Sequence, residues 1–122
     1  MPLRQSTIGQ IAVNVHDLPL AVSFSRDTLG LKFLFEVPSM AFFDINGIRL
    51  MLGKPEKAEF DHPASIIYYK VRDLRETHKQ LVSKSVIFAS DPHLVARMPD
   101  HELWMAFFKD PDGNLLALMS EL

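Results

Sequence analysis

Hydrophobic and polar residues alternate over several short stretches that are rich in Val, Ile and Phe. An alternation with period two is typical of half-buried β-strands. The first half of the chain contains four such stretches, at residues 8–15, 32–37, 40–45 and 48–52. The second half contains another four, at residues 66–71, 86–89, 102–108 and 115–119. The pattern therefore predicts a protein built mainly of short strands.

One stretch in each half has helical spacing instead, and it directly follows the first strand of that half. Asp17 is placed to cap the first helix, and Gly30 is placed to end it. Asp73, with Glu76 three residues later, forms a capping-box pattern that opens the second helix. The predicted apolar faces consist of Leu18, Ala21, Val22 and Leu29 in the first helix, and of Leu74, Leu81 and Val82 in the second. Each half thus has the order βαβββ.

Turn residues separate these elements. Asn46-Gly47 between two strands predicts a two-residue hairpin turn. Asp110 and Asp112 belong to an Asp-Pro-Asp-Gly turn, which we interpret as structural rather than as a pair of catalytic carboxylates. Residues 53–65 are polar and contain two prolines, so we expect a connector between the halves, and residues 91–100 are expected to form a loop.

The two halves also repeat each other in sequence. Residues 10–18 align with residues 66–74, and residues 44–52 align with residues 110–118. A module of this size cannot bury its apolar face alone. We therefore predict an α+β fold in which tandem βαβββ modules form a curved mixed sheet with a concave cleft. A single domain would span residues 1–122, with module one at 6–53, the connector at 53–65 and module two at 66–122.

Composition narrows the possible partners. The net charge of the 122-residue chain is −2, which argues against nucleic-acid binding. No stretch reaches the roughly 20 apolar residues of a membrane-spanning helix. Cysteine is absent, which removes disulfides, thiolate nucleophiles and thiolate metal ligands. We expect a cytoplasmic protein with no nucleic-acid or membrane partner.

Two segments carry a resemblance to a known family. The first is Gln-Ile-Ala-Val-Asn-Val-His-Asp-Leu at residues 10–18, continued by Phe-Ser-Arg-Asp-Thr-Leu-Gly-Leu at 24–31. The second is Phe-Phe-Lys-Asp-Pro-Asp-Gly-Asn at 107–114. Together, in a duplicated βαβββ order, they resemble the vicinal oxygen chelate superfamily, which includes glyoxalase I, extradiol dioxygenases, methylmalonyl-CoA epimerase and the fosfomycin- and bleomycin-resistance proteins. The resemblance implies paired modules around a cleft.

The same resemblance implies a place for a metal. In catalytic members, four side chains from equivalent strands of the two modules hold a divalent ion. The resemblance puts those positions at Gln10, Met51, Ile66 and Ala117. Only Gln10 offers a suitable oxygen, and shifting the register by one residue brings in no carboxylate or imidazole. We therefore predict that the metal site of the family is absent and that the protein needs no cofactor.

The strand periodicity predicts which other side chains share a face with these positions. Asn14 shares a face with Gln10, Arg49 with Met51, and Tyr68 with Ile66. Trp104 would add an aromatic ring nearby. An apolar base with a few polar groups is typical of small-molecule sites. We predict a ligand site formed by Gln10, Asn14, Arg49, Met51, Ile66, Tyr68, Arg97, Trp104 and Ala117, although Arg49 could equally be a solvated surface charge.

Histidines provide the remaining candidate chemistry. His93, Arg97 and His101 could form a polar rim over the cleft, with His101 as a catalytic acid or base and Arg97 binding an anion. Alternatively, these side chains only satisfy the backbone of their own loop. A metal site made of His62, His93 and His101 matches no standard spacing.

Three hypotheses for function follow. The leading one is a metal-independent protein of the glyoxalase and bleomycin-resistance type that binds a small organic molecule in the cleft. The alternative is an isomerase or lyase of the glyoxalase or epimerase kind, in which Gln10, Tyr68 and His101 polarise a carbonyl and move a proton. The third is a structural subunit with a vestigial cleft. Whether the chain is an enzyme stays open, and we expect a homodimer.

Overall fold

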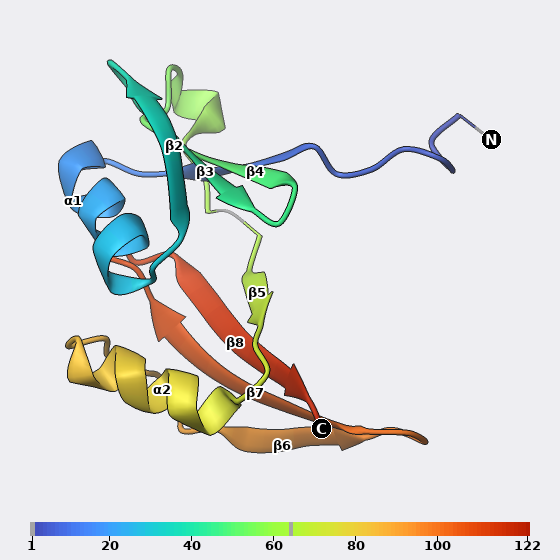
Figure 1. Cartoon of the computed structure of the whole chain (residues 1–122). Helices are drawn as coiled ribbons and strands as arrows, with labels where there is room; N and C mark the ends of the chain where they lie inside the picture. The colour runs from blue at the N-terminus through green and yellow to red at the C-terminus, as the bar shows by residue number, and fades with distance from the viewer. Residues whose placement is uncertain (1, 64) are drawn as a thin grey trace. The chain divides into compact units, whose positions relative to one another are not determined.

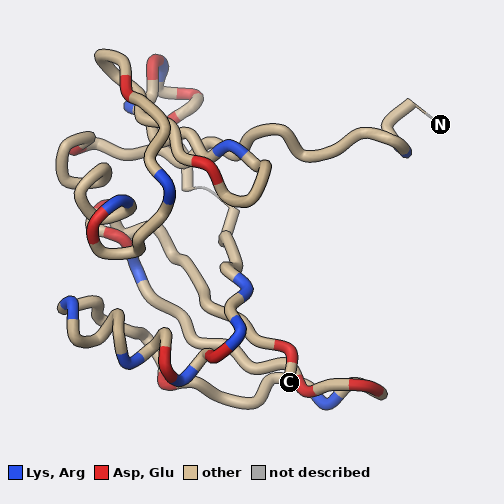
Figure 2. The backbone as a smooth tube through the Cα atoms, viewed as in Figure 1, with Lys and Arg blue, Asp and Glu red and all other residues tan. Residues whose placement is uncertain are grey.

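In residues 2–63 and 65–122, which the computed structural model describes, eight strands form two four-stranded sheets (Figure 1). The chain divides after residue 64 into two units, and each unit contains one of the sheets. Basic and acidic residues are interspersed along both units (Figure 2). Among the described residues, no helix is long and apolar enough to cross a membrane.

The first unit contains a βαβββ module followed by the connector. Its elements are β1 (Gln10–Asn14), α1 (Leu18–Ser23), the π-helical turn η1 (Phe24–Thr28), β2 (Lys32–Val37), β3 (Met40–Ile45), β4 (Ile48–Gly53) and the 3₁₀ turn η2 (Ala58–Phe60). The strand order is β1-β4-β3-β2, with β1 parallel to β4 and the other neighbours antiparallel. The side chain of Asp17 caps α1 by accepting from the Leu20 amide at 3.1 Å, as predicted.

The second unit repeats this topology. Its elements are β5 (Ile67–Lys70), α2 (Leu74–Ser83), β6 (His93–Arg97), β7 (Glu102–Lys109) and β8 (Leu115–Glu121). The order β5-β8-β7-β6, with β5 parallel to β8, matches that of the first sheet. Asp73 caps α2 through the Glu76 amide at 3.1 Å. The predicted α+β class and the duplicated βαβββ order are therefore confirmed.

Three local predictions in the second unit were wrong. Strand β6 lies inside the predicted loop at residues 91–100. The strand predicted at residues 86–89 is reduced to a single bridge between Phe88 and Phe108. Val82, predicted on the buried face of α2, is 49% exposed. An edge strand such as β6 has one neighbour and little burial, so its hydrophobic alternation is weak.

Each sheet buries one face against its helix. Helix α1 contacts β3 and β4, and α2 contacts β7 and β8. Phe43, which pairs with Leu50, is fully buried in the first unit, and Phe108, which pairs with Leu116, is fully buried in the second. Burying such a ring stabilises the fold by about 2–3 kcal/mol. The two units thus have equivalent aromatic centres in their cores.

The hairpin between β3 and β4 has the predicted two-residue turn. Asn46 has a φ of 47° and Gly47 a φ of 99°, so both central residues are left-handed, as a type I′ turn requires. The Gly47 amide donates to Asp44 Oδ1 at 3.1 Å. This turn sets the register that pairs Asp44 with Arg49.

The two tyrosines of β5 lie on opposite faces of the second sheet. Tyr68 is 42% exposed, whereas Tyr69 pairs with Leu118 on the face that α2 covers. Burial, with a smaller contribution from the nearby Asp110 carboxylate, raises the pKa of Tyr69 to about 12.

We expect Gly47→Ala to destabilise the protein by about 1 kcal/mol, because a Cβ at this positive φ is strained even though no atom lies within 4 Å of it. Gly9→Ala is the matched control, since Gly9 also has open space but no positive φ. Urea denaturation of both variants measures the difference. Equal stabilities would contradict the assigned turn.

We expect alkaline titration, followed by tyrosinate absorbance, to show one phase near pH 12 that Tyr69→Phe abolishes and Tyr68→Phe retains. Because the folded pKa lies above the unfolded value near 10, the contribution of Tyr69 to stability is fully present below about pH 10. It falls between about pH 10 and 12, by at most about 1.4 kcal/mol per pH unit. Loss of this phase in Tyr68→Phe, or its persistence in Tyr69→Phe, would contradict the face assignment.

Candidate functional site

The open face of the first sheet, opposite α1, carries the predicted residues of module one. The register pairs Gln10 with Arg49 and Ala12 with Met51. Leu50 and Leu52 alternate with Arg49 and Met51 along β4 and are buried on the helix side. Because successive side chains of a strand point to opposite faces, Gln10, Arg49 and Met51 share the open face.

These three side chains contact one another. Arg49 Nε donates to Gln10 Oε1 at 2.8 Å, and Gln10 Nε2 donates to Met51 Sδ at 3.7 Å. The Arg49 guanidinium lies 5.5 Å from the ring centre of Phe42, which stacks on Phe35 at 4.6 Å. A continuous row therefore crosses the sheet from β1 to β2.

A pocket of about 280 Å³ lies on the same face, with Met51 in its wall. Its floor comes from the sheet, and its cover comes from the connector, whose η2 turn carries an exposed phenyl ring. The lining residues are Ala12, Asn14, Met40, Met51, Gly53, Lys54, Pro55, Glu56, Phe60 and His62. Gly53 leaves room in the floor, since a Cβ there would stand 3.2 Å from Met40 Cγ. Thioethers and one aromatic ring surrounded by polar groups suit an amphipathic organic molecule.

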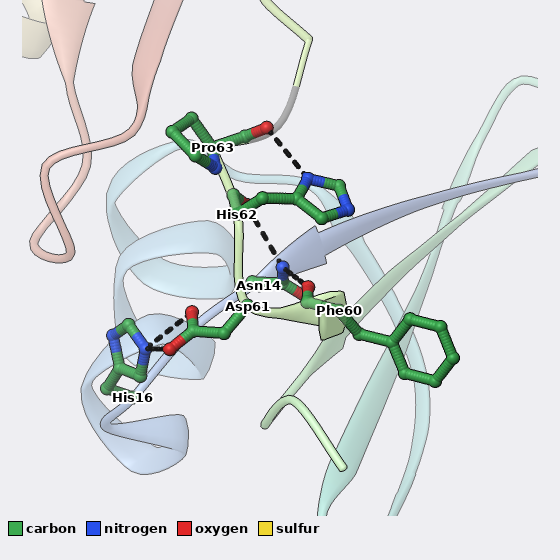
Figure 3. Close-up of polar contacts among 6 residues, drawn as sticks. All are labelled: Asn14, His16, Phe60, Asp61, His62 and Pro63. Atoms are coloured by element: carbon green, nitrogen blue, oxygen red, sulfur yellow. Dashed lines mark hydrogen bonds and ion pairs between the residues drawn. The ribbon is translucent and has the colours of Figure 1, made fainter. Parts of the chain in front are cut away.

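Two side chains at the end of β1 hold the connector in place (Figure 3). Asn14 Nδ2 donates to the carbonyl oxygens of Phe60 and His62, the latter at 3.1 Å. His16 Nε2 lies 3.0 Å from Asp61 Oδ1. The sequence analysis predicts Asn14 in the ligand site and assigns no role to His16. The structure adds that both residues contact the segment that covers the pocket.

The open face of the second sheet carries the predicted residues of module two. Ile66 precedes β5 by one residue, and Tyr68 pairs with Ala117. The Tyr68 ring meets Phe107 edge to face at 5.9 Å, and the imidazole of His93 stacks on Phe107 at 6.4 Å. Ala117 is fully buried beneath these neighbours. This face is apolar and aromatic.

His101 lies at the end of this face in a chain of charged groups. Its Nδ1 lies 2.7 Å from Asp100 Oδ1, and its Nε2 lies 3.2 Å from Glu121 Oε2. Lys70 Nζ contacts the other Glu121 oxygen at 3.1 Å. The hydrogen bond from His101 lowers the pKa of Asp100. Both ring nitrogens of His101 are therefore engaged by carboxylates.

The structure places Trp104 on the other face of the sheet, which corrects its predicted position. Trp104 pairs with Ser120 and shares the helix side with Phe108. Trp104 Nε1 donates to Glu102, which also accepts from Arg97 Nε at 3.2 Å, so Arg97 pairs with a carboxylate.

Trp104 also lines a second pocket of about 410 Å³ in the second unit. Its lining residues are Arg72, Asp73, Leu74, Arg75, Pro92, Trp104 and Leu122.

Metal-ligating side chains are dispersed. Across residues 2–63 and 65–122, no group of three or more His, Asp or Glu is arranged to hold a metal ion.

The Asp110 carboxylate accepts from the amides of Asp112 and Asn114 at 3.0 and 2.8 Å, as the structural interpretation of this turn requires. The sequence did not reveal Phe60 as a pocket residue, because a cover formed by an irregular segment has no periodic pattern.

We expect Asn14→Ala to loosen the connector, because it removes the side-chain amide that donates to two connector carbonyls. The amides of Phe60 and Asp61, which donate to Lys57 and Ala58, should exchange with deuterium about thirtyfold faster, on the basis of about 1 kcal/mol for each of the two hydrogen bonds. Ser23→Ala on α1 is the control. Unchanged protection in Asn14→Ala would contradict the role of this side chain.

Comparison with known proteins agrees with this architecture. A sequence model of the Glyoxalase/Bleomycin resistance protein/Dioxygenase superfamily matches residues 7–118. The chain is 28% identical over 130 residues to the uncharacterized protein YraH of Bacillus subtilis (strain 168), covering 93% of this chain and 97% of the relative. It is 26% identical over 117 residues to the metallothiol transferase FosB of Lysinibacillus sphaericus (strain C3-41), covering 88% of this chain and 77% of the relative.

Among solved structures, a superfamily member from Sphaerobacter thermophilus DSM 20745 superposes with a TM-score of 0.77 at 26% identity, covering 95% of this chain and 98% of that one. The match to the superfamily runs through both βαβββ modules. This chain therefore belongs to the Glyoxalase/Bleomycin resistance protein/Dioxygenase superfamily.

Proposed function

We propose that this protein binds a small organic molecule on the open face of its first sheet, without the metal ion of its catalytic relatives. The pocket beside Met51 supports binding, because it combines an apolar floor with the polar groups of Lys54, Glu56 and His62 at its wall. Binding would sequester or sense the ligand and would break no bond in it.

One observation supports the metal-free part of the proposal: the guanidinium of Arg49 already engages the one side chain that could donate an oxygen to the family's metal. Gln10 Oε1, the one suitable donor, accepts from Arg49 at 2.8 Å. Met51 contributes a soft thioether, and Ile66 and Ala117 contribute only hydrocarbon. A hard divalent ion needs several oxygen or nitrogen donors and is repelled by a guanidinium. These residues therefore do not fit the family's metal.

One relative is named as a metallothiol transferase, which is an enzyme. An enzymatic function is therefore the alternative for this chain. That alternative depends on His101 accepting a proton. Both nitrogens of His101 face carboxylates, which favours the binding function over acid-base catalysis. The homodimer and the cytoplasmic location stay predictions.

We expect a thermal-shift screen of amphipathic aromatic and acyl compounds to raise the melting temperature of the wild-type protein, whereas Zn²⁺, Ni²⁺, Mn²⁺ or Fe²⁺ alone should not. Binding to the folded state stabilises it by about 2.7 kcal/mol at a hundredfold excess over Kd. Ala12→Trp should abolish the ligand response by filling the pocket. Ala12→Ser, which nearly preserves the volume, should retain it.

Two controls make this test decisive. A variant with Met51→Glu, Ile66→His and Ala117→Glu restores the donors that the resemblance implies, and it shows whether the assay detects metal. Elemental analysis of wild-type protein purified without chelator should find far less than one metal per chain. Stoichiometric metal in the wild type, or a ligand response that survives Ala12→Trp, would overturn the proposal.

A further inference from the structure

We propose that Arg49 is the anchor for an anionic group of the ligand, so that the ligand class is an organic anion with an aromatic body. This inference rests on the proposed function and narrows it. It follows from the observation that the side chains at the family's metal positions do not suit a metal ion. The guanidinium of Arg49 contacts Gln10, the one residue expected to bind a dication. A guanidinium supplies positive charge and directed donors, so it attracts the same kind of ligand atom as a dication does: an anionic oxygen.

The hydrogen bonding of Arg49 leaves its outer edge available. Nε is occupied by Gln10 at 2.8 Å, and this bond orients the guanidinium plane. Within residues 2–63, no carboxylate forms an ion pair with Arg49. Asp44, its neighbour on β3, accepts instead from the Gly47 amide at 3.1 Å. The two terminal nitrogens can therefore donate to one carboxylate or phosphoryl group in a bidentate manner.

Aromatic rings next to Arg49 provide a surface for the body of the ligand. The guanidinium lies over Phe42, and Phe35 stacks on that ring with an angle of 28° between the planes. Phe35 is on the edge strand β2 and is 47% exposed. Stacking on such rings is worth about 0.5–1.5 kcal/mol per pair beyond burial. An anion bound at Arg49 would thus have apolar surface within reach, both on these rings and at Met51.

The first unit contains a matched arginine that lacks these properties. Arg26 also lies over a phenyl ring, that of Phe33, at 5.8 Å. Its Nε and terminal nitrogen, however, donate to the Asp27 carboxylate at 3.0 and 3.2 Å. The charge of Arg26 is therefore already balanced. Phe33 pairs with the buried Phe43, so it lies on the helix side, whereas Phe42 lies on the open side. Arg26 thus serves as an internal control for cation–ring packing without anion binding.

The experiment compares naphthoate with its neutral counterpart naphthalenemethanol by isothermal titration calorimetry and by the Nε–Hε signal of Arg49. We expect wild-type protein to bind naphthoate at least about tenfold more tightly, which corresponds to about 1.4 kcal/mol for charge-assisted hydrogen bonds. Arg49→Ala should remove this preference, so that the two compounds bind with similar affinity. Arg49→Lys should retain part of it, and Arg26→Ala should retain all of it.

The possible outcomes separate this inference from the function on which it rests. Equal affinities in the wild type, a preference for naphthoate that survives Arg49→Ala, or exclusive binding of neutral compounds from the screen would each overturn the anchor while leaving the binding function in place. If no compound binds, both fail. Binding of naphthoate that depends on Arg49 and not on Arg26 supports the anchor.

Discussion

The alternation of side chains along β4 is the constraint from which the candidate site follows. Leu50 and Leu52 are held on the helix side because they close the core around Phe43. Arg49 and Met51 must then point the other way, whatever their own preference for solvent. Parallel pairing with β1 brings Gln10 beside Arg49. The composition of the open face is therefore fixed by core packing on the opposite face.

Electrostatics then decides what this face can hold. A dication exchanges its hydration shell only for several hard donors, and a nearby guanidinium adds repulsion. An organic anion, in contrast, is attracted by the guanidinium. The thioethers and aromatic rings of this face would replace water around its apolar part. Under the proposed function, the same fold would retain its pocket and exchange the kind of charge it recognises through a few substitutions on one face.

Much of the fold could be predicted because the local signals agree with the tertiary packing. The Asn46-Gly47 turn, the caps at Asp17 and Asp73 and the strands of the first unit all follow from local chemistry. Strand β6 could not be predicted, because an edge strand with alternate exposed residues has little hydrophobic signal, and a bulge between Leu94 and Ala96 interrupts its register. Proximity in sequence does not predict the position of Trp104, because alternate residues of β7 occupy opposite faces of the sheet. The pocket cover was not predicted, since it depends on long-range contacts between β1 and the connector.

Comparison of the two modules shows that their open faces differ in chemistry. Two core positions on the helix side of β4 keep their chemistry across the repeat: Leu50 corresponds to Leu116, and Leu52 to Leu118. Positions on the open side do not, because the changes are Gln10 to Ile66, Ala12 to Tyr68, Arg49 to Leu115 and Met51 to Ala117. Packing against a helix tolerates few side chains, whereas an open face is constrained only by what binds there. The guanidinium–amide pair therefore belongs to one module alone, while the second sheet has an aromatic surface built around Tyr68 and Phe107, with Lys70 and His101 at its end.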